Sequence, residues 1–199
     1  MAKRVDHDQR RREITARALR LFSQVGYDNV SLIMIAAAAG ISRTVLYRYF
    51  CSKREVMDAA ILSVIEVIEG RCVKLIASRL DVVKKLEGVC HAVAEEMFNH
   101  REFLIAVFDF VVGMVRSGAD MNKSISDFTS GTRNAIRLLI AHGKRAGAFP
   151  EILIEERTAD ALYAEFESCA MRIVLGTEKS ADQAKVRFSD VIRAISIWK

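Results

Sequence analysis

The side chains best suited to binding chemistry gather in one short segment, Ser42–Lys53, which reads SRTVLYRYFCSK. It contains two arginines, Arg43 and Arg48, and two tyrosines, Tyr47 and Tyr49. A guanidinium group donates several hydrogen bonds from a planar fork, and a hydroxyl group donates one and accepts others. Groups of this kind bind phosphates and the hydrogen-bonding edges of bases. The segment is therefore a candidate for contacts with a large anion.

Positive charge is distributed unevenly along the chain. Residues 1–54 contain 11 Lys and Arg against 4 Asp and Glu, a net charge of +7, whereas the remaining 145 residues contain 19 against 21, a net charge of −2. All the excess positive charge therefore lies in the first quarter. A solvated basic face would explain it, but a basic module beside a neutral body is more typical of a nucleic-acid-binding protein.

The elements that hold this segment are expected to be helices. The chain of 199 residues is 51% hydrophobic and 28% charged, and it has ten glycines and a single proline, Pro150. This composition predicts a folded chain with few helix breakers. Apolar spacing and cap residues predict an all-α protein of about nine helices, at 8–24, 31–38, 42–49, 52 onwards for some six turns, 81–99, 101–116, 121–146, 155–175 and 181–197.

Two short helices within residues 31–49 form a recognisable pair. Ser31 and Ser42 are suited to cap them, and a glycine lies in the tight turn between them. This arrangement is the helix-turn-helix pattern. In the second helix, Leu46 and Phe50 should point inward, leaving outward a polar set that fits a DNA major groove about 12 Å wide: Arg43, Thr44, Tyr47, Arg48 and Tyr49.

The run TARALRLFSQVGYDNVSLIMIAAAAGISRTVLYRYFCSKREVMDAAI resembles the DNA-binding domain of the tetracycline-repressor (TetR) family of transcriptional regulators. The segments ALRLFSQVGYDNVS, IAAAAGIS and LYRYFCSK carry the resemblance, which covers roughly residues 10–60. It implies a three-helix DNA-binding head, which we assign to residues 1–51. It also implies a helical body, residues 52–199, that dimerises and binds a small effector.

The resemblance also implies which residues contact DNA. Ser31 would meet a phosphate from the cap of the second helix, and Lys53 would face phosphate at the start of the fourth. Arg43 and Thr44 are expected at base edges, although the family often has glycine at the latter position. The complete set is Ser31, Ser42, Arg43, Thr44, Tyr47, Arg48, Tyr49 and Lys53.

A group of large apolar side chains predicts an effector pocket in the helical body. One histidine approaches the group from another helix, and the set is Phe98, Phe103, Phe108, Phe110, Met114 and His142. A mostly apolar cavity of this kind would bind a small hydrophobic or amphipathic molecule. Core packing is nevertheless the preferred interpretation for most of these residues, and a hydrogen-bonded core histidine is the preferred interpretation of His142. The leading hypothesis is a repressor that such an effector releases, and the alternative is a regulatory or architectural DNA-binding protein without an effector.

Apolar stripes on the last two helices predict a homodimer. The residues assigned to the interface are Leu162, Tyr163, Phe166, Ile173, Phe188, Val191, Ile192 and Ile195. Pairing these helices with a second copy would form a four-helix interface, whereas the simpler alternative is that they close the core of one chain. A two-fold dimer with recognition helices about 34 Å apart would require double-stranded DNA with a near-palindromic operator.

Other functional classes have little support. The chain lacks the sequence motifs of phosphate-binding loops, nucleophile elbows and zinc hydrolases, so an enzyme is the least favoured hypothesis and no cofactor is expected. His91 and Glu95 have the spacing of a metal pair, but a solvated polar stripe is the preferred interpretation. We therefore expect no metal site.

Cysteine spacing and hydropathy indicate a cytoplasmic protein. The four cysteines form no disulfide or zinc pattern, and we expect them to be small buried residues. The longest apolar run, 103–115, is 13 residues long and includes Asp109. A membrane-spanning helix needs roughly 20 apolar residues, so no membrane association is expected.

Overall fold

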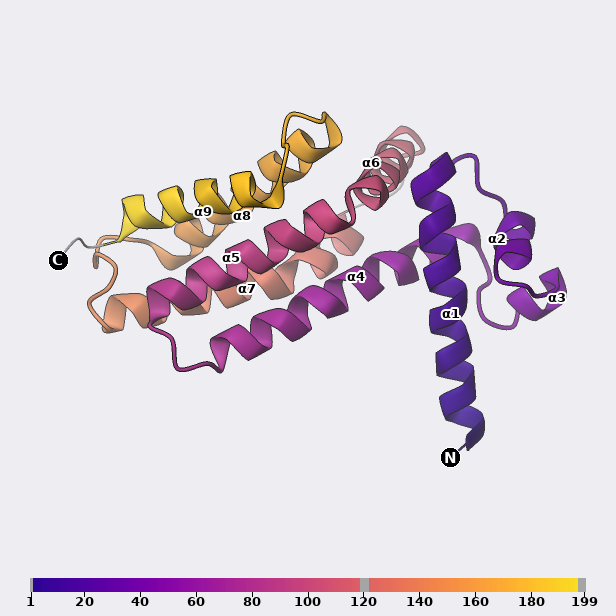
Figure 1. Ribbon diagram of the computed structural model, residues 1–199, viewed down its shortest axis with the longest axis horizontal. Coiled ribbons are helices and arrows are strands. Elements are labelled where there is room, and N and C mark those ends of the chain that lie inside the picture. The colour runs from indigo at the N-terminus through magenta and orange to yellow at the C-terminus, as the bar shows by residue number, and fades with distance from the viewer. Residues whose placement is uncertain (1, 119–121, 197–199) are drawn as a thin grey trace. The chain divides into compact units, whose positions relative to one another are not determined.

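The computed structural model describes residues 2–118 and 122–196, and within these ranges every regular element is a helix (Figure 1). The all-α prediction is confirmed. The helices are α1 (Ala2–Val25), α2 (Leu32–Ala38), α3 (Arg43–Leu46), α4 (Lys53–Ile76), α5 (Val82–Asn99), α6 (Arg101–Arg116), α7 (Asn122–Arg145), α8 (Glu155–Val174) and α9 (Ala181–Ile195). Most bounds lie within a residue or two of those predicted, but α1 begins earlier and α3 ends earlier.

Local capping explains where several helices begin and end. Ser31, Ser42, Asp81 and Ser180 each accept a hydrogen bond from the backbone N–H three residues further on. An N-cap of this kind stabilises a helix by about 1 kcal/mol. After α1 the chain turns at Gly26, whose φ of 79° is in the left-handed region that favours glycine. Local sequence therefore fixes these helix ends.

The helices group into two compact units. Unit 1 comprises Met1–Ile65 and Glu102–Met121, and unit 2 comprises Glu66–Arg101 and Asn122–Lys199. This division differs from the predicted boundary after residue 51, because the first part of α4 and nearly all of α6 belong with the N-terminal helices. The cause is a shared core: Val56 of α4 and Phe110 of α6 are buried in the same cluster as Phe22 of α1.

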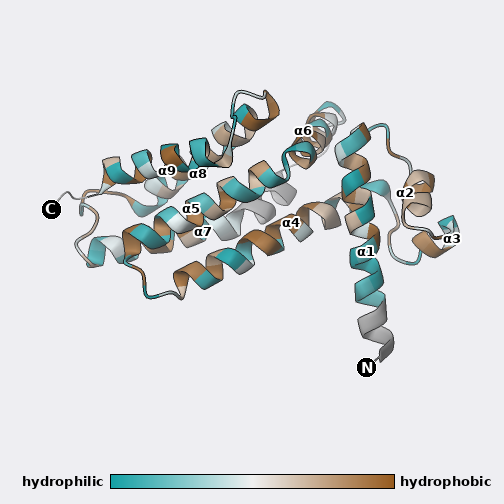
Figure 2. Cartoon of the chain, viewed as in Figure 1, coloured by the Kyte–Doolittle hydropathy of each residue, from teal (hydrophilic) through white to brown (hydrophobic). Residues whose placement is uncertain are grey.

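Unit 1 is built on one apolar core that fixes α2 and α3 against α1. Its fully buried side chains come from all of these helices and include Ile14, Phe22, Ile35, Leu46 and Phe50. Hydrophobic residues, brown in Figure 2, recur along the helices that contribute to this core. Burying each large apolar side chain contributes roughly 1.5–3 kcal/mol before the entropy cost of ordering it. The short α3 is thus stabilised chiefly by its packing.

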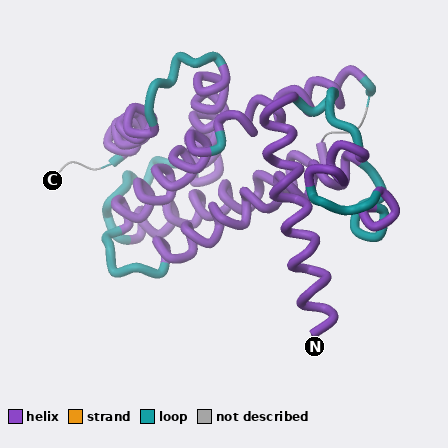
Figure 3. The backbone as a smooth tube through the Cα atoms, turned by 45° about the vertical axis from the view of Figure 1, so that its right-hand side comes forward, coloured by secondary structure: helices purple, strands orange, loops and turns teal. Residues whose placement is uncertain are grey.

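Unit 2 is a bundle in which α5 packs against α7, α8 and α9. Figure 3 shows the loops that join α4 to α5, α7 to α8 and α8 to α9 at the ends of this bundle. The rings of Phe166 and Phe188 join α8 to α9 with their centroids 4.5 Å apart. Phe149, fully buried, packs so closely on α7 that a Cβ at Gly143 would lie 2.2 Å from its ring. The bundle therefore has its own close-packed core.

The apolar stripes of α8 and α9 belong largely to this core, which corrects the predicted dimer interface. Five of the eight assigned residues are buried within a single chain: Leu162, Phe166, Ile173, Phe188 and Ile192. The other three, Tyr163, Val191 and Ile195, are half-buried. The stripes are wide because α8 faces α7 and α5 while α9 faces α5 and α8. Of the assigned residues, these three half-buried ones are those that stay partly accessible to a partner.

Three of the four cysteines are buried, and the helices of the described ranges are not of the membrane-spanning type. Cys72, Cys90 and Cys169 are buried free thiols, as expected, whereas Cys51 is exposed, contrary to the prediction. Burial raises the pKa of the Cys90 thiol far above its usual value. Over the described ranges, no helix is both long enough and apolar enough to cross a membrane.

Candidate nucleic-acid interface

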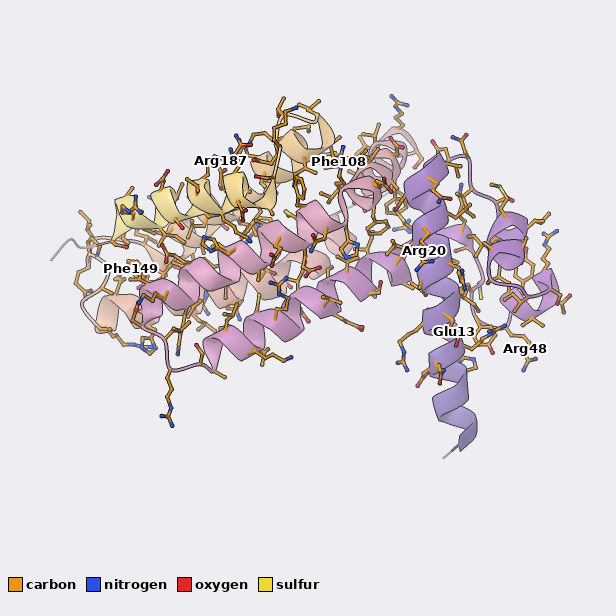
Figure 4. All side chains as sticks on the ribbon, viewed as in Figure 1. Glu13, Arg20, Arg48, Phe108, Phe149 and Arg187 are labelled. Atoms are coloured by element: carbon orange, nitrogen blue, oxygen red, sulfur yellow. The ribbon has the colours of Figure 1, made fainter. Side chains whose placement is uncertain are left out.

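The surface of α3 and the turn after it presents a compact group of polar side chains. Arg43, Thr44, Tyr47 and Arg48 are exposed, and Figure 4 labels Arg48 in this region. Leu46 lies beneath them and is fully buried. The predicted outward orientation of these four side chains is confirmed. The apolar side of α3 therefore holds the helix on unit 1 while its polar side is left for a partner.

The recognition segment is tighter than predicted. Regular α-helix ends at Leu46, and the chain continues through a turn in which Arg48 N–H bonds to the Val45 carbonyl at 3.1 Å and Tyr49 N–H to the Leu46 carbonyl at 2.9 Å. Hydrogen bonds to the third preceding residue wind the backbone more tightly than an α-helix. The segment contains only one regular helical turn, but backbone hydrogen bonds continue as far as the buried Phe50.

Tyr49 does not share the outward orientation predicted for it. It is half-buried against the core of unit 1, and its ring lies 4.6 Å from the ring of His7. Its carbonyl accepts a hydrogen bond from Arg11 Nη1 at 2.7 Å. The side chain therefore packs between α1 and the turn after α3, because residue 49 is next to the buried Phe50 at the end of that turn.

An ion pair and a cap fix the junction between α3 and α4, and sequence reasoning did not identify the ion pair. Arg11 of α1 approaches Glu55 of α4 at 3.3 Å, and its guanidinium lies over the Phe50 ring at 4.2 Å. Glu55 also accepts a hydrogen bond from the Cys51 N–H at 2.7 Å. Ser52 and Glu55 have the S-x-x-E spacing of a capping box, but no local pattern links Glu55 to α1.

The two predicted cap serines are exposed and already hold their helices. Ser31 Oγ accepts from Met34 N–H at 3.2 Å, and Ser42 Oγ accepts from Val45 N–H at 3.2 Å. A hydroxyl that accepts a bond in this way keeps its own proton for donation. Each serine can therefore donate to a phosphate without giving up its cap.

Lys53 has internal partners that the sequence did not indicate. Its Nζ donates to the carbonyl of Tyr27 at 2.8 Å and to that of Asp28 at 3.3 Å, and it lies 4.2 Å from the centre of the Tyr27 ring. Burial raises the pKa of the Tyr27 hydroxyl, so the ring stays neutral. An ammonium group has three N–H donors, which leaves one for an outside group. Lys53 therefore has a structural role in addition to its predicted phosphate contact, which stays a prediction.

The predicted effector residues fall into different parts of the fold. Phe103 and Phe110 are buried in the core of unit 1, where Phe110 meets Tyr27 edge-on at 4.8 Å, and Met114 packs against that core. Phe103, Phe110 and Met114 therefore belong to the core of unit 1, and core packing was one of the two interpretations considered for them. Phe108 of α6 is half-buried, as is Phe98 of α5 in unit 2.

His142 is exposed, but it borders a cavity. The side chain is exposed on α7, so it is not a core histidine. It lines a cavity of about 300 Å³ in unit 2 together with Leu80, Val83, Lys85 and Ala148. The apolar face of α7 ends before residue 142 because the last turn of this helix faces solvent at its outer side.

His91 and Glu95 form interhelical bonds instead of a solvated stripe. His91 Nε2 lies 2.9 Å from Ser189 Oγ of α9, and Glu95 pairs with Arg71 of α4 and with Lys185 of α9. The hydrogen bond from Arg71 is the largest cause of a lowered pKa at Glu95, followed by that from Lys185. Among the described residues, no three His, Cys, Asp or Glu side chains come together as a metal-binding group.

Similarity to known proteins is most specific in the N-terminal helices. A model of the family described as bacterial regulatory proteins, tetR family, matches residues 14–60. The HTH-type transcriptional regulator HbdR of Aromatoleum sp. (strain CIB) is 30% identical over 86 residues, which are 43% of this chain and 36% of that protein. The chain thus matches little more than a third of the length of that relative.

Two further proteins are similar over most of the chain. The HTH-type transcriptional regulator PksA of Bacillus subtilis (strain 168) is 28% identical over 177 residues, 88% of this chain and 83% of that protein. The solved structure of the transcriptional regulator FadR from Bacillus subtilis in complex with stearoyl-CoA superposes with a TM-score of 0.77 at 15% identity, covering 90% of this chain and 96% of that one. The second likeness concerns the fold alone.

Proposed function

We propose, from the premise that this chain belongs to the tetR family of bacterial regulatory proteins, that it is a transcriptional regulator that binds double-stranded DNA. One observation carries the proposal: Arg43, Thr44, Tyr47 and Arg48 are exposed together on a helix whose other side is anchored by Leu46. A helix held in this way can enter the major groove. Arg43 and Thr44 would then read base edges, and Arg48 would bind phosphate.

We further propose that the DNA-bound form is a homodimer joined through the exposed faces of α8 and α9. The support is a group of apolar side chains on these faces: Met171 is 44% exposed, Leu175 67% and Val186 60%. The alanines Ala161 and Ala164 are exposed on the same stripe of α8 and would let a second copy approach closely. Two copies related by a two-fold axis would require a near-palindromic operator.

Charged substitutions on these faces test the dimer. Met171→Glu combined with Val186→Glu should convert the dimer into a monomer, because two carboxylates would be buried in the interface. Leu138→Glu is a matched control, since Leu138 is 52% exposed on α7 and lies outside the proposed interface. Sedimentation of the unchanged protein as a stable monomer at micromolar concentration would contradict the proposal.

The proposed function also includes a small-molecule effector. We propose a repressor that a small apolar or amphipathic molecule releases from its operator. The similar regulator FadR is described in complex with stearoyl-CoA, which makes long-chain acyl thioesters the first class to test. To change the DNA-competent population from 99:1 to 1:99, an effector must favour the incompetent state by about 5.5 kcal/mol.

A selection experiment tests the function as a whole. Genomic fragments retained by the purified protein should share a near-palindromic sequence, and affinity for that sequence should exceed affinity for random DNA. Stearoyl-CoA, shorter acyl thioesters and free fatty acids are then tested for thermal stabilisation and for release of the retained fragment. Specific binding that none of these compounds alters favours the effector-free regulator, and absence of any sequence preference contradicts the proposal.

A further inference from the structure

Arg43 is exposed but held in one orientation by a neighbour on the same helix. Its Nη2 donates a hydrogen bond to Tyr47 Oη at 2.9 Å, and its Cζ lies 5.4 Å from the centre of the Tyr47 ring. Arg43 is the first residue of α3 and Tyr47 is its C-cap, four positions on. Residues at this spacing are neighbours on a helix surface. The pair therefore forms a single unit on the outer face of α3.

The other exposed arginine of this surface has no such support. Among the residues that the structure describes, no side chain bonds to Arg48, which is exposed like Arg43. Tyr47 is itself 42% exposed, so its hydroxyl is not needed to fill the core of unit 1. The hydrogen bond thus orients one particular guanidinium group, and it contributes little to the packing of the fold.

An oriented guanidinium is suited to reading a base. Arginine has five N–H donors in a fixed fork, and the bond to Tyr47 uses one of them. The remaining donors include a parallel pair, which matches the O6 and N7 acceptors of guanine in the major groove. A phosphate places a weaker demand on direction, because many approaches satisfy it. Restricting the rotation of Arg43 before binding also reduces the entropy lost on contact.

We propose that Tyr47 is a positioning residue that holds Arg43 for reading one guanine of the operator, so that preference at that base pair depends on the Tyr47 hydroxyl. This inference rests on the proposed DNA-binding function. It goes beyond the predicted place of Tyr47 among the residues that contact DNA, because it gives the hydroxyl a role in reading a base. It also assigns a chemical class to one operator position, a G·C pair whose guanine faces Arg43.

The experiment measures base preference and salt dependence separately. The full chain and its variants Tyr47→Phe, Arg43→Ala and Arg43→Lys are used to select binding sites from a pool of operators randomised at every position. Arg43→Ala should lose preference for guanine at one position of each half-site, by a factor between about 5 and 150. Tyr47→Phe should lose up to about tenfold at that same position and nowhere else.

Two further readouts separate positioning from a phosphate contact. Removing the hydroxyl from the Arg43→Ala variant should cost nothing more at that position, because the two residues act as one unit. Tyr47→Phe and Arg43→Lys should leave the salt dependence of binding to random DNA unchanged, since each keeps its charge. Circular dichroism of each variant verifies that the fold is retained.

Three outcomes would overturn the inference. If Tyr47→Phe weakens binding to specific and random DNA alike and lowers the log–log salt slope, Tyr47 is a backbone contact. If the base preferences of Tyr47→Phe equal those of the unchanged protein, the hydroxyl does not position Arg43. If the unchanged protein has no base preference at all, the proposed function fails and this inference fails with it.

Discussion

Two groups of arginines, one in unit 2 and one in unit 1, differ in what surrounds them. In unit 2, Arg172 and Arg187 enclose Glu178, whose side chain is completely buried, and both also pair with Glu165. In unit 1, the exposed arginines Arg12, Arg20 and Arg48 lie on α1 and on the turn after α3, and none has a carboxylate partner among the described residues.

This difference separates charges that hold the fold together from charges that remain available. A buried carboxylate is stable only with close partners, so removing one partner is costly. An exposed arginine without a partner is solvated, and its removal changes folding very little. Substitution of a paired arginine such as Arg187 of unit 2 should therefore damage folding, whereas substitution of an exposed arginine such as Arg48 of unit 1 should damage DNA binding.

The largest expected effect is on the buried carboxylate of unit 2. Arg187→Met should lower the free energy of unfolding by roughly 3 kcal/mol, because Glu178 loses one of its two arginine partners. Replacing both groups, as in Arg187→Met with Glu178→Gln, should cost less than the single change. The measurement is denaturant unfolding, with Arg48→Met as the matched control at under about 0.5 kcal/mol. Equal losses for the two single variants would remove the distinction between the units.

A middle-sized effect is expected where a basic residue of unit 1 has an internal role. Lys53→Met keeps the aliphatic stem but loses the bonds to the Tyr27 and Asp28 carbonyls, and it should destabilise unit 1 by about 1–2 kcal/mol. Because two of the three N–H donors of the ammonium group are engaged by carbonyl groups, the salt slope of DNA binding should change by less than the 0.9 of a full phosphate contact. A stable variant with a slope reduced by about 0.9 would restore the prediction made from the sequence.

A smaller effect concerns the pH dependence of unit 2. Arg71 and Lys185 lower the pKa of Glu95 in the folded chain, so its contribution to stability is present above the unfolded-state pKa of about 4.3. That contribution is lost as pH falls through the lower, folded-state pKa. Glu95→Gln should cost about 1 kcal/mol near neutral pH and almost nothing in strong acid. Unfolding curves of both proteins between about pH 2 and pH 7 measure this, and a difference independent of pH would contradict it.

Features set by neighbouring residues were predictable from the sequence. The caps Ser31 and Ser42 were placed by short motifs, and the burial of Leu46 and Phe50 followed from helical spacing. These properties depend on residues within a few positions of one another. The polar surface of α3, which is the main part of the candidate site, was therefore accessible before the structure.

Features set by distant residues were not predictable in the same way. Helical periodicity indicates that Phe110 and Phe188 are buried, but it does not say in which core, so α6 was assigned to a ligand pocket and α9 to a dimer. The bond from Lys53 to the Tyr27 carbonyl joins positions 26 apart. The pairing of Glu178 depends on a loop whose sequence carries no motif. Each of these outcomes is decided by tertiary packing.

We propose that the exposed arginines of unit 1 bind DNA while those of unit 2 do not. The salt dependence of affinity distinguishes the two groups. Arg48→Ala is compared with Arg145→Ala, an equally exposed arginine at the end of α7, with the operator affinity measured from low to moderate salt. The log–log slope should fall by about 0.9 for Arg48→Ala and be unchanged for Arg145→Ala. Equal slopes for the two variants would contradict it.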